Sequence, residues 1–503
     1  MIDLTVAQIA DIVGGRLADI SPDEAASTHV TGTVEFDSRA VTPGGLFLAL
    51  PGARSDGHDF AQGAVEAGAV AVLAARPVGV PAVVVPPAEA ADAHAGVLEH
   101  DADGSGAAVL SALAKLAAAV AADLVAGGLR IVGLTGSSGK TSTKDLIAAV
   151  LKPLGEVVAP PGSFNNELGH PWTVLRATGA TDFLVLEMSA RHRGNIAALA
   201  RIAAPSIAAV LNVGTAHLGE FGSREMIALT KGELVEALPA SGVAILNADD
   251  PMVAAMATRT SARVVTVGRS ATADIRALDV VLDDLARPRF RLCTPIGEVD
   301  VALAVHGEHQ VGNALSAAAV ALECGANLQQ IADALAGAAP ASRHRMEVRT
   351  RSDGVTVIND AYNANPDSVR AGLQALAVMA RNDGGRGGAR QSAGPRRSWA
   401  VLGEMGELGE DSITEHDRVG RLAVRLDISR LVVVGSGRSM SAMHHGAVME
   451  GSWGSESIMV PDADSALELL RAELAPGDVV LVKASNAAGL GALAEALQAD
   501  ESA

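Results

Sequence analysis

The segment LTGSSGKTS, at residues 134–142, constrains the fold of this chain more than any other. The apolar run 130–134 before it is typical of a short buried strand, and residues 141–151 after it have the apolar spacing of one helix face. The glycines between them permit a tight turn whose backbone N–H groups point toward an anion, at the positive end of the helix dipole. The segment therefore predicts a strand, a phosphate-binding loop and a helix.

Two side chains give this loop the chemistry of a nucleoside triphosphate site. Lys140 supplies a point charge for the β- and γ-phosphates, and the Thr141 hydroxyl suits Mg²⁺. The spacing departs from the usual P-loop pattern, because the position five residues before Gly139 is Leu134 and not a glycine. A glycine-rich structural turn with an incidental lysine is the alternative, and the flanking strand and helix favour the phosphate loop.

Charge and cysteine content exclude several classes of function. With 58 acidic and 39 basic residues the net charge is −19, which repels polyanions and gives no support to nucleic-acid binding. The two cysteines, Cys293 and Cys324, are too far apart in sequence for a paired motif and fit a reducing compartment. The N-terminus lacks the basic region and apolar core of an export signal. We therefore expect a cytoplasmic protein.

The longest apolar stretch is Ala107–Gly127, and it contains Lys115 and Asp123. These charges interrupt the pattern of a spanning segment, so the stretch predicts a packed amphipathic helix, and no membrane span is expected.

Strand and helix patterns divide the 503 residues into three α/β domains, expected at 1–105, 106–341 and 342–503. The first contains strand patterns at 45–50 and 69–73 and a helical pattern at 60–67. In the second, strands alternate with helices, which predicts a mainly parallel sheet with helices on both faces. Its strands are expected at 130–135, 182–188, 206–213, 242–247 and 263–267. Those of the third are expected at 355–359, 398–402, 430–434 and 478–483.

Within the third domain, Asn382–Arg397 is rich in Gly, Arg and Ser and has no apolar periodicity. Such a composition predicts a mobile surface insertion.

Three further residues of the central domain are candidates for the nucleotide site. Glu187 ends an apolar strand, at the edge where open α/β sheets bind ligands, and His217 follows the next strand. Each alone is more typical of a surface or capping residue. Lys231 lies in a helical pattern, where an isolated lysine is usually a solvated side chain. These residues gain weight only in combination.

The third domain contains the turn-rich segment 357–366, which includes Tyr362, the only tyrosine in the chain. Asn, Asp and Pro residues form turns for local reasons, and a capped helix entry explains the segment as well as a binding loop does.

Ten blocks along nearly the whole chain resemble the Mur ligases of peptidoglycan assembly, and most closely their dipeptide-adding MurF type. The short phosphate loop is the form that this family uses. The blocks are FDSRAVTPGGLFLAL with SDGHDF (36–60), TGSSGKTS (135–142), FNNELGHPW (164–172), EMSARHRGNI (187–196), LNVGTAHLGEFGS (211–223), TKGEL (230–234), HQVGNALSAAAVA (309–321), SRHRME (342–347), DAYNANPDS (360–368) and LGEMGELG (402–409).

The resemblance implies a function for each domain. The first would hold the uridine diphosphate of the acceptor, the central P-loop domain would bind ATP, and the third, Rossmann-like domain would receive the incoming dipeptide. The expected ATP-binding residues are Gly136, Ser137, Ser138, Gly139, Lys140, Thr141, Ser142, Asn313, Arg345 and Asp360. The expected substrate-binding residues are Ser38, Arg39, Asn165, Asn166, Ser189 and Arg193 for the acceptor, and Tyr362, Asn363 and Asn365 for the dipeptide.

The resemblance also implies a Mg²⁺ site at Thr141, Glu187, His217 and Lys231. Lys231 resembles the lysine that becomes carbamylated in this family, and a carbamate, unlike an ammonium, suits this hard cation. Lys140, Lys231 and His217 are the residues expected to support catalysis.

The implied reaction joins D-alanyl-D-alanine to UDP-N-acetylmuramoyl-tripeptide at the expense of ATP, through an acyl phosphate, in a monomeric enzyme. The chain departs from the family near its end, where Lys483-Ala484-Ser485-Asn486 stands in place of a Lys-Gly-Ser-Arg run. Ligases that add a single amino acid, folylpolyglutamate synthetases and a P-loop regulator without ligase activity are the alternatives. The Asn-Ala-Asn-Pro turn at 363–366 favours the dipeptide-adding type.

Overall fold

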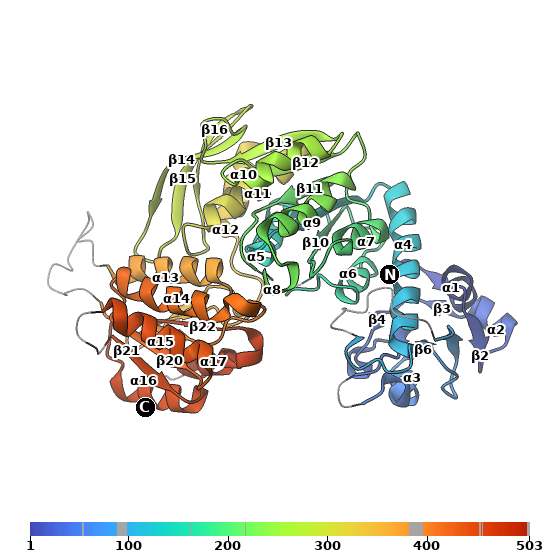
Figure 1. The fold of residues 1–503 in the computed structure, drawn as a ribbon. Helices are drawn as coiled ribbons and strands as arrows, with labels where there is room; N and C mark the ends of the chain where they lie inside the picture. Colours follow the sequence, from blue (N-terminus) through green and yellow to red (C-terminus); the bar gives the residue numbers. More distant parts are fainter. Residues whose placement is uncertain are drawn as a thin grey trace.

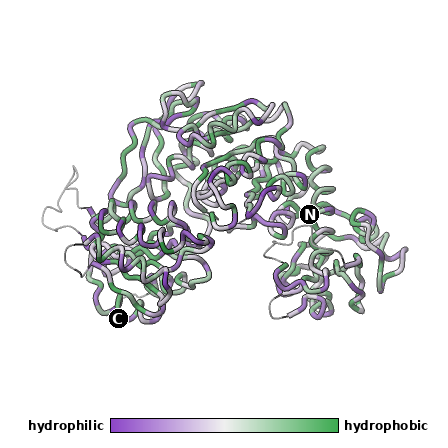
Figure 2. The backbone as a smooth tube through the Cα atoms, in the orientation of Figure 1, coloured by the Kyte–Doolittle hydropathy of each residue, from purple (hydrophilic) through white to green (hydrophobic). Residues whose placement is uncertain are grey.

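The computed structural model describes residues 1–52, 55–87, 98–160, 162–216, 218–381, 396–451, 454 and 456–499. Its three main sheets lie in separate parts of the chain, with the central part between the other two (Figure 1). Figure 2 shows apolar stretches in all three parts, as expected where each sheet has its own core. The expected three-part α/β architecture is confirmed, while the domain boundaries stay predictions.

The N-terminal domain is built on a five-stranded sheet in the order β2-β7-β6-β5-β4. The α1 helix starts with a capping box, in which the side chains of Thr5 and Gln8 each accept from the other residue's backbone N–H. The elements are β1 (Leu4–Thr5), α1 (Val6–Val13), β2 (Arg16–Ala18), α2 (Pro22–Ser27), β3 (His29–Val30), β4 (Val34–Glu35), β5 (Gly45–Leu48), α3 (Ala61–Glu66), β6 (Ala69–Ala74) and β7 (Ala82–Val84).

The long helix α4 (Ser105–Ala126) joins the first two domains. It starts where the Asp101 carboxylate accepts from the backbone N–H groups of Gly106 (2.9 Å) and Ala107 (2.8 Å). Its apolar residues belong to one core that runs from α1 to the central sheet. Among the described residues α4 is the one helix long and apolar enough to cross a membrane, and 56% of its apolar window is buried inside the protein. Such burial is typical of a core helix.

The central sheet has nine strands in the order β16-β15-β14-β13-β12-β11-β8-β10-β9, and every pair from β9 to β14 is parallel. Successive residues of β8 face opposite sides, so that Ile131 belongs to the core that contains α4 and α7, and Val132 belongs to the core that contains α5 and α11. The predicted parallel sheet with helices on both faces is therefore confirmed. The strands are β8 (Arg130–Thr135), β9 (Val157–Val158), β10 (Phe183–Glu187), β11 (Ile207–Val210), β12 (Val243–Asn247) and β13 (Arg263–Gly268).

Helices of the central domain cover both faces of the sheet; α5 to α10 lie between the parallel strands in the chain, and α11 and α12 follow β16. They are α5 (Lys140–Leu151), α6 (Gly169–Val174), α7 (Asn195–Ile202), α8 (Leu218–Phe221), α9 (Arg224–Glu236), α10 (Pro251–Ala254), α11 (Gln310–Glu323) and α12 (Leu328–Gly337).

An antiparallel extension of this sheet is a feature that the sequence patterns did not predict. It consists of β14 (Ile275–Leu282), β15 (Pro288–Thr294) and β16 (Gly297–Ala302). The turn between β14 and β15 reaches the C-terminal domain (Figure 1), where Ala286 is fully buried in that domain's core. The extension therefore forms a second contact between the two domains, besides the chain connection.

The C-terminal domain has a six-stranded sheet in the order β17-β18-β22-β19-β20-β21, parallel except for the pair β17 and β18. Helices α13 to α15 cover one face and α16 and α17 the other. Residues 382–395 of the expected insertion lie outside the described residues. The elements are β17 (Glu347–Thr350), β18 (Thr356–Asn359), α13 (Pro366–Ala380), β19 (Ser398–Leu402), α14 (Ser412–Arg425), β20 (Arg430–Val434), α15 (Arg438–Glu450), β21 (Ser457–Val460), α16 (Ala463–Glu473), β22 (Val479–Lys483) and α17 (Leu490–Ala499).

A buried histidine fixes the loop that follows β19. His416 is fully buried on α14; its Nδ1–H donates to the Ser412 carbonyl (2.6 Å), and its Nε2 accepts from the Met405 backbone N–H (2.9 Å). This pair of bonds requires the neutral ring, and burial lowers the pKa of His416 below its ordinary value.

The stability of the protein should therefore fall as the pH drops below about 6.5, the ordinary histidine pKa. Below that pH the unfolded chain takes up a proton at His416 that the folded chain does not, so the slope contributed is at most about 1.4 kcal/mol per pH unit. In urea denaturation between pH 7.5 and 5, His416→Gln should show a smaller loss than the wild type, because glutamine keeps a donor and an acceptor without titrating. An equal loss in both proteins would contradict this role.

Candidate functional site

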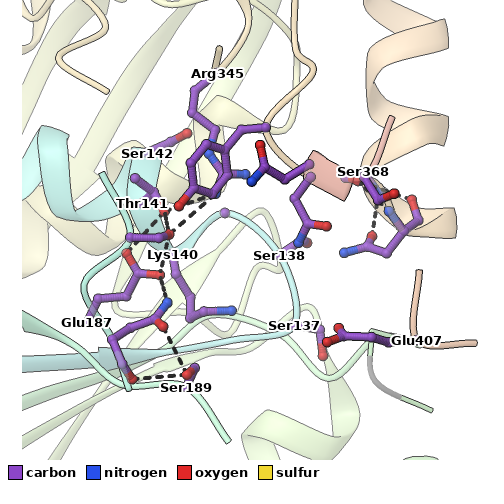
Figure 3. Close-up of a pocket in the computed structure, with 18 of the residues that line it drawn as sticks. Ser137, Ser138, Lys140, Thr141, Ser142, Glu187, Ser189, Arg345, Ser368 and Glu407 are labelled. Atoms are coloured by element: carbon purple, nitrogen blue, oxygen red, sulfur yellow. Dashed lines mark hydrogen bonds between the residues drawn. The ribbon is translucent and has the colours of Figure 1, made fainter. Parts of the chain in front are cut away.

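A cavity of about 820 Å³ lies between the central and C-terminal domains. It opens at the carboxyl end of β8, where β10 pairs on one side and β11 on the other, so the strand order reverses there. Open α/β sheets bind ligands at such a point. Figure 3 shows side chains of both domains directed into this space.

The phosphate loop is held in a tight conformation around its own backbone. The Asn212 side chain accepts from the N–H groups of Ser137 (2.9 Å) and Ser138 (3.0 Å), and donates to the Ser138 carbonyl (3.1 Å). Gly139 has a left-handed backbone (φ +80°), and a Cβ there would lie 2.7 Å from Asn313 Oδ1. This position therefore requires glycine on both counts.

Lys140 folds back over the loop, with its Nζ donating to the Gly136 carbonyl at 2.8 Å. Burial lowers the pKa of Lys140, an effect that the nearby Glu187 carboxylate opposes. The ammonium group is thus placed beside the turn whose backbone forms the anion site.

Glu187, at the end of β10, is the centre of a cluster of polar side chains. Its carboxylate accepts from Thr141 Oγ1 (3.0 Å), Asn165 Nδ2 (2.7 Å) and Ser163 Oγ (3.3 Å). Ser189 in turn donates to the Asn165 side-chain oxygen (3.0 Å), as the dashed lines in Figure 3 show. A buried carboxylate beside two hydroxyl groups is a donor set that a hard divalent cation accepts.

Lys231 lies on α9 and is only 4% exposed. No hydrogen bond or ion pair connects it to another of the residues that the structure describes. Burial, together with the charge of Lys140, places the pKa of Lys231 well below its ordinary value. A solvated surface lysine is therefore the wrong interpretation of this residue. His217 lies outside the described residues, so its expected role stays a prediction.

The C-terminal domain brings a second set of polar groups to the cavity. The Arg345 guanidinium stacks on the Tyr362 ring (4.3 Å to the centroid), and its Nη2 lies 3.4 Å from Thr141 Oγ1. Asp360 and Lys483 form a buried ion pair (2.5 Å), and the Lys483 ammonium also donates to the Asn363 carbonyl (2.9 Å). These two contacts of Lys483 hold the segment 360–365 in place.

Direct contacts hold the two domains together around the cavity. The Asp367 carboxylate, at the start of α13, accepts from the Thr215 backbone N–H at 3.1 Å. Arg191, in the loop after β10, pairs with Glu407 of the C-terminal domain at 3.4 Å. These bonds link the central domain, which contains the phosphate loop, to the C-terminal domain, which is expected to receive the second substrate.

Most of the expected site residues line this one cavity. They are Ser137, Ser138, Gly139, Lys140, Thr141, Ser142, Asn165, Asn166, Glu187, Ser189, Asn313, Arg345, Asp360, Tyr362, Asn363 and Asn365.

Five of the expected residues that the structure describes lie away from the cavity lining, and the buried Lys231 is one of them. Gly136 forms the base of the loop, and Arg193 is exposed, whereas Arg191 lines the cavity. Ser38 and Arg39 are in the N-terminal domain, where the 88% exposed Arg39 side chain pairs with Asp37 at 2.7 Å.

Sequence reasoning missed several polar residues of the lining, namely Ser163, Arg191, Asn212, Asp367, Glu407 and Lys483. Arg191, Asn212, Asp367 and Glu407 lie inside the quoted blocks, which was a usable signal. Ser163 carried no such signal, because its partner Glu187 is 24 residues away. Lys483 begins the run compared with the family's Lys-Gly-Ser-Arg, but its partner Asp360 is 123 residues away and could not be inferred from that run.

Three family models match successive parts of the chain: "Mur ligase family, catalytic domain" at 31–121, "Mur ligase middle domain" at 134–321 and "Mur ligase, glutamate ligase domain" at 344–486. The chain is also 71% identical to a UDP-N-acetylmuramoyl-tripeptide–D-alanyl-D-alanine ligase of Mycobacterium tuberculosis, over 100% of this chain and 99% of the relative. The chain belongs to the Mur ligase family, in its MurF type. The Escherichia coli enzyme of the same name is 33% identical to this Mur ligase over 99% of each chain.

Solved structures give the same result for the fold of this Mur ligase. A MurF structure from Acinetobacter baumannii matches with a TM-score of 0.79 and 29% identity, over 99% of both chains. The MurF ligase of Thermotoga maritima in complex with ADP matches with a TM-score of 0.74 and 28% identity, over 93% of this chain and 97% of the other.

Replacing Lys483 by methionine should destabilise the Mur ligase by about 3–5 kcal/mol, because the buried Asp360 carboxylate loses its counter-ion. Urea denaturation would measure this loss. Arg418→Ala is the matched control, since its partner Glu415 pairs with a guanidinium that is 67% exposed, and such pairs contribute less than about 1 kcal/mol. Equal stability of the two variants would contradict the structural role of Lys483.

Proposed function

We propose that this Mur ligase uses ATP to join D-alanyl-D-alanine to UDP-N-acetylmuramoyl-tripeptide, the reaction for which its curated relatives are named. The observation that carries the proposal is the single cavity shared by the phosphate loop and the turn 360–365. A carboxylate that is activated at the loop therefore shares one cavity with an amine that is held at the turn. We propose that this reaction takes place in the cytoplasm, as a step of peptidoglycan precursor synthesis, and that the enzyme is a monomer.

ATP is proposed to bind along the loop from Gly136 to Ser142. The N–H groups of residues 139–142, at the start of α5, and Lys140 would receive its phosphates, because the N–H groups of Ser137 and Ser138 are bound to Asn212. Asn313 lies against the loop at Gly139, and Arg345 and Asp360 approach from the C-terminal domain, so we assign these three to the nucleotide as well. The relative from Thermotoga maritima was solved with ADP, which supports nucleotide use by this fold.

Mg²⁺ is proposed to be held by Thr141 and Glu187, whose side-chain oxygens lie 3.0 Å apart beside the loop. When bound, the cation would neutralise charge on the phosphates. His217 and a carbamylated Lys231 are proposed as further ligands. The buried Lys231 amine has no partner among the described residues, and carbamylation would convert it into an oxygen ligand of opposite charge.

The acceptor is proposed to extend from the N-terminal domain to the cavity. Ser38 and Arg39 would contact its uridine diphosphate, and Asn165, Asn166, Ser189 and Arg193 its peptide. Tyr362, Asn363 and Asn365 would orient the dipeptide. These assignments follow from the family blocks, and the placement of Asn165, Asn166 and Ser189 in the cavity supports the peptide part.

The chemistry needs no nucleophilic side chain. The terminal carboxylate of the tripeptide attacks the γ-phosphate of ATP, and ADP leaves as an acyl phosphate forms. The dipeptide amine then attacks the acyl carbon, phosphate leaves, and the amine loses a proton. Lys140 and the loop N–H groups stabilise the transferring phosphoryl group, and contact between the two domains excludes water that would hydrolyse the acyl phosphate.

Purified protein with ATP and Mg²⁺ should release phosphate only when both the UDP-muramoyl-tripeptide and D-alanyl-D-alanine are present. Phosphate release and the mass of the amide product measure this directly. A panel of single D-amino acids and other UDP-muramoyl-peptides is the control for the related ligases. Hydrolysis of ATP that is indifferent to both substrates would contradict the proposal and favour a nucleotide-binding regulator.

Lys231→Ala should lose most of its turnover and regain part of it when short carboxylates are added, because a free carboxylate can replace the carbamate oxygens. Turnover with and without added acetate or bicarbonate is the measurement. Lys152→Ala, which removes an exposed lysine at the end of α5, should show the wild-type rate and no response to acetate. A wild-type rate in Lys231→Ala would remove this residue from the metal site.

A further inference from the structure

The connection between the central and C-terminal domains changes partners within a few residues. Ser342 is bound on the central side, because its N–H donates to Asp145 Oδ2 (3.1 Å) and its hydroxyl accepts from the Gly162 N–H (3.1 Å). His344 is bound on the C-terminal side, where its carbonyl accepts from the Tyr362 N–H at 3.3 Å. The chain therefore passes from one domain to the other between residues 342 and 344.

The backbone at this crossing is held in an unusual conformation. His344 (φ +57°) and Met346 (φ +49°) are left-handed without being glycine. Non-glycine residues keep such angles only where their surroundings fix them, and such sites are common at hinges and functional loops. The bonds of Ser342 and the bond from the Met346 N–H to Asp360 (3.1 Å) are the contacts on either side that do so.

A buried lysine completes the contacts on the central side. Lys144, on α5 and 1% exposed, donates to the carbonyl groups of Pro160 and Gly162 (3.2 Å for Gly162) and pairs with Asp145 at 2.9 Å. The bonds form a closed ring, from Lys144 to Gly162, to Ser342, to Asp145 and back to Lys144. A buried ammonium is tolerated only when it is paired and hydrogen-bonded, and this ring satisfies it.

The two segments that leave this ring both lead to residues that line the cavity. After Gly162 the chain continues to Ser163 and Asn165, which bind the Glu187 carboxylate. After Ser342 it continues to Arg345, whose Nη2 lies 3.4 Å from both Thr141 Oγ1 and Ser163 Oγ. The ring thus lies where α5, the loop 162–166 and the interdomain connection meet.

We propose that Lys144 is a positioning residue for ligation. Through the ring with Asp145 and Ser342, it fixes the Ser163–Asn166 loop and the connection that delivers Arg345 in one arrangement relative to the phosphate loop. Lys144 is not part of the cavity lining and acts through these groups. The inference rests on the proposed ligase function. It adds a residue that links the position of the interdomain connection to the position of the loop that would contact the acceptor peptide.

Lys144→Met removes the donors and keeps most of the buried volume. Turnover should fall about 10- to 100-fold, because small displacements of positioned groups have effects of this size. The KM for ATP should change less than about threefold, since the loop N–H groups and Lys140 stay in place. More phosphate should be released per amide formed, because a loosened connection admits water to the acyl phosphate. A lysine that only stabilised the fold would lower the melting temperature and leave this ratio unchanged.

Two further variants complete the test. Ser342→Ala removes one bond of the ring from the other side, so it should raise the ratio of phosphate to amide too, and the double variant should lose less than the product of the two single effects. Lys115→Met is the control for the loss of a lysine that donates to a backbone carbonyl, because Lys115 donates to Val13 (3.3 Å) from an exposed position on α4. It should retain wild-type kinetics.

The outcomes separate the two proposals. Absence of amide formation by the wild type overturns the proposed function and this inference with it. If the wild type ligates, wild-type turnover and phosphate-to-amide ratio in Lys144→Met overturn the inference alone. Should Lys144→Met fail to fold, Ser342→Ala decides, and a wild-type ratio in that variant overturns the role of the ring.

Discussion

The parallel pairing of β8 with β10 and β11 is the constraint on which the rest of the site depends. Parallel strands end at one edge of a sheet, so this pairing brings the phosphate loop, Glu187 and Asn212 together although they are far apart in sequence. Asn212 then holds the loop backbone, and Glu187 gathers the hydroxyl and amide groups of Thr141, Ser163 and Asn165. A change in strand order would separate these groups whatever their local conformation.

The contacts around the cavity differ in their exposure to solvent. Arg191 and Glu407 are part-exposed, and such pairs contribute little to stability. The pair of Asp360 and Lys483 and the ring around Lys144 are buried and lie within one domain or at the connection, where they hold groups that line the cavity. The turn between β14 and β15, with its fully buried Ala286, adds a buried contact between the same two domains.

Much of the fold could be predicted from the sequence, because it depends on local periodicity. The strand at 130–135, the glycine loop and the helix after it are specified by neighbouring residues, and the structure confirms them. The antiparallel strands from β14 to β16 were missed, and the burial of Ala286 shows why: the turn that contains it is ordered by packing on a distant domain. Lys231 was first interpreted as solvated, because burial of a helical lysine depends on what packs over it.

The sequence by itself determined the family, the phosphate loop and the identity of most polar residues of the cavity, since these are encoded in short ordered blocks. Only the tertiary structure decided that Arg191 and not Arg193 lines the cavity, that Lys483 neutralises Asp360, and that Lys144 and Asp145 bind the interdomain connection at Ser342. The physical reason is that a side chain's partner is set by strand order and domain packing, which join residues that no local pattern relates.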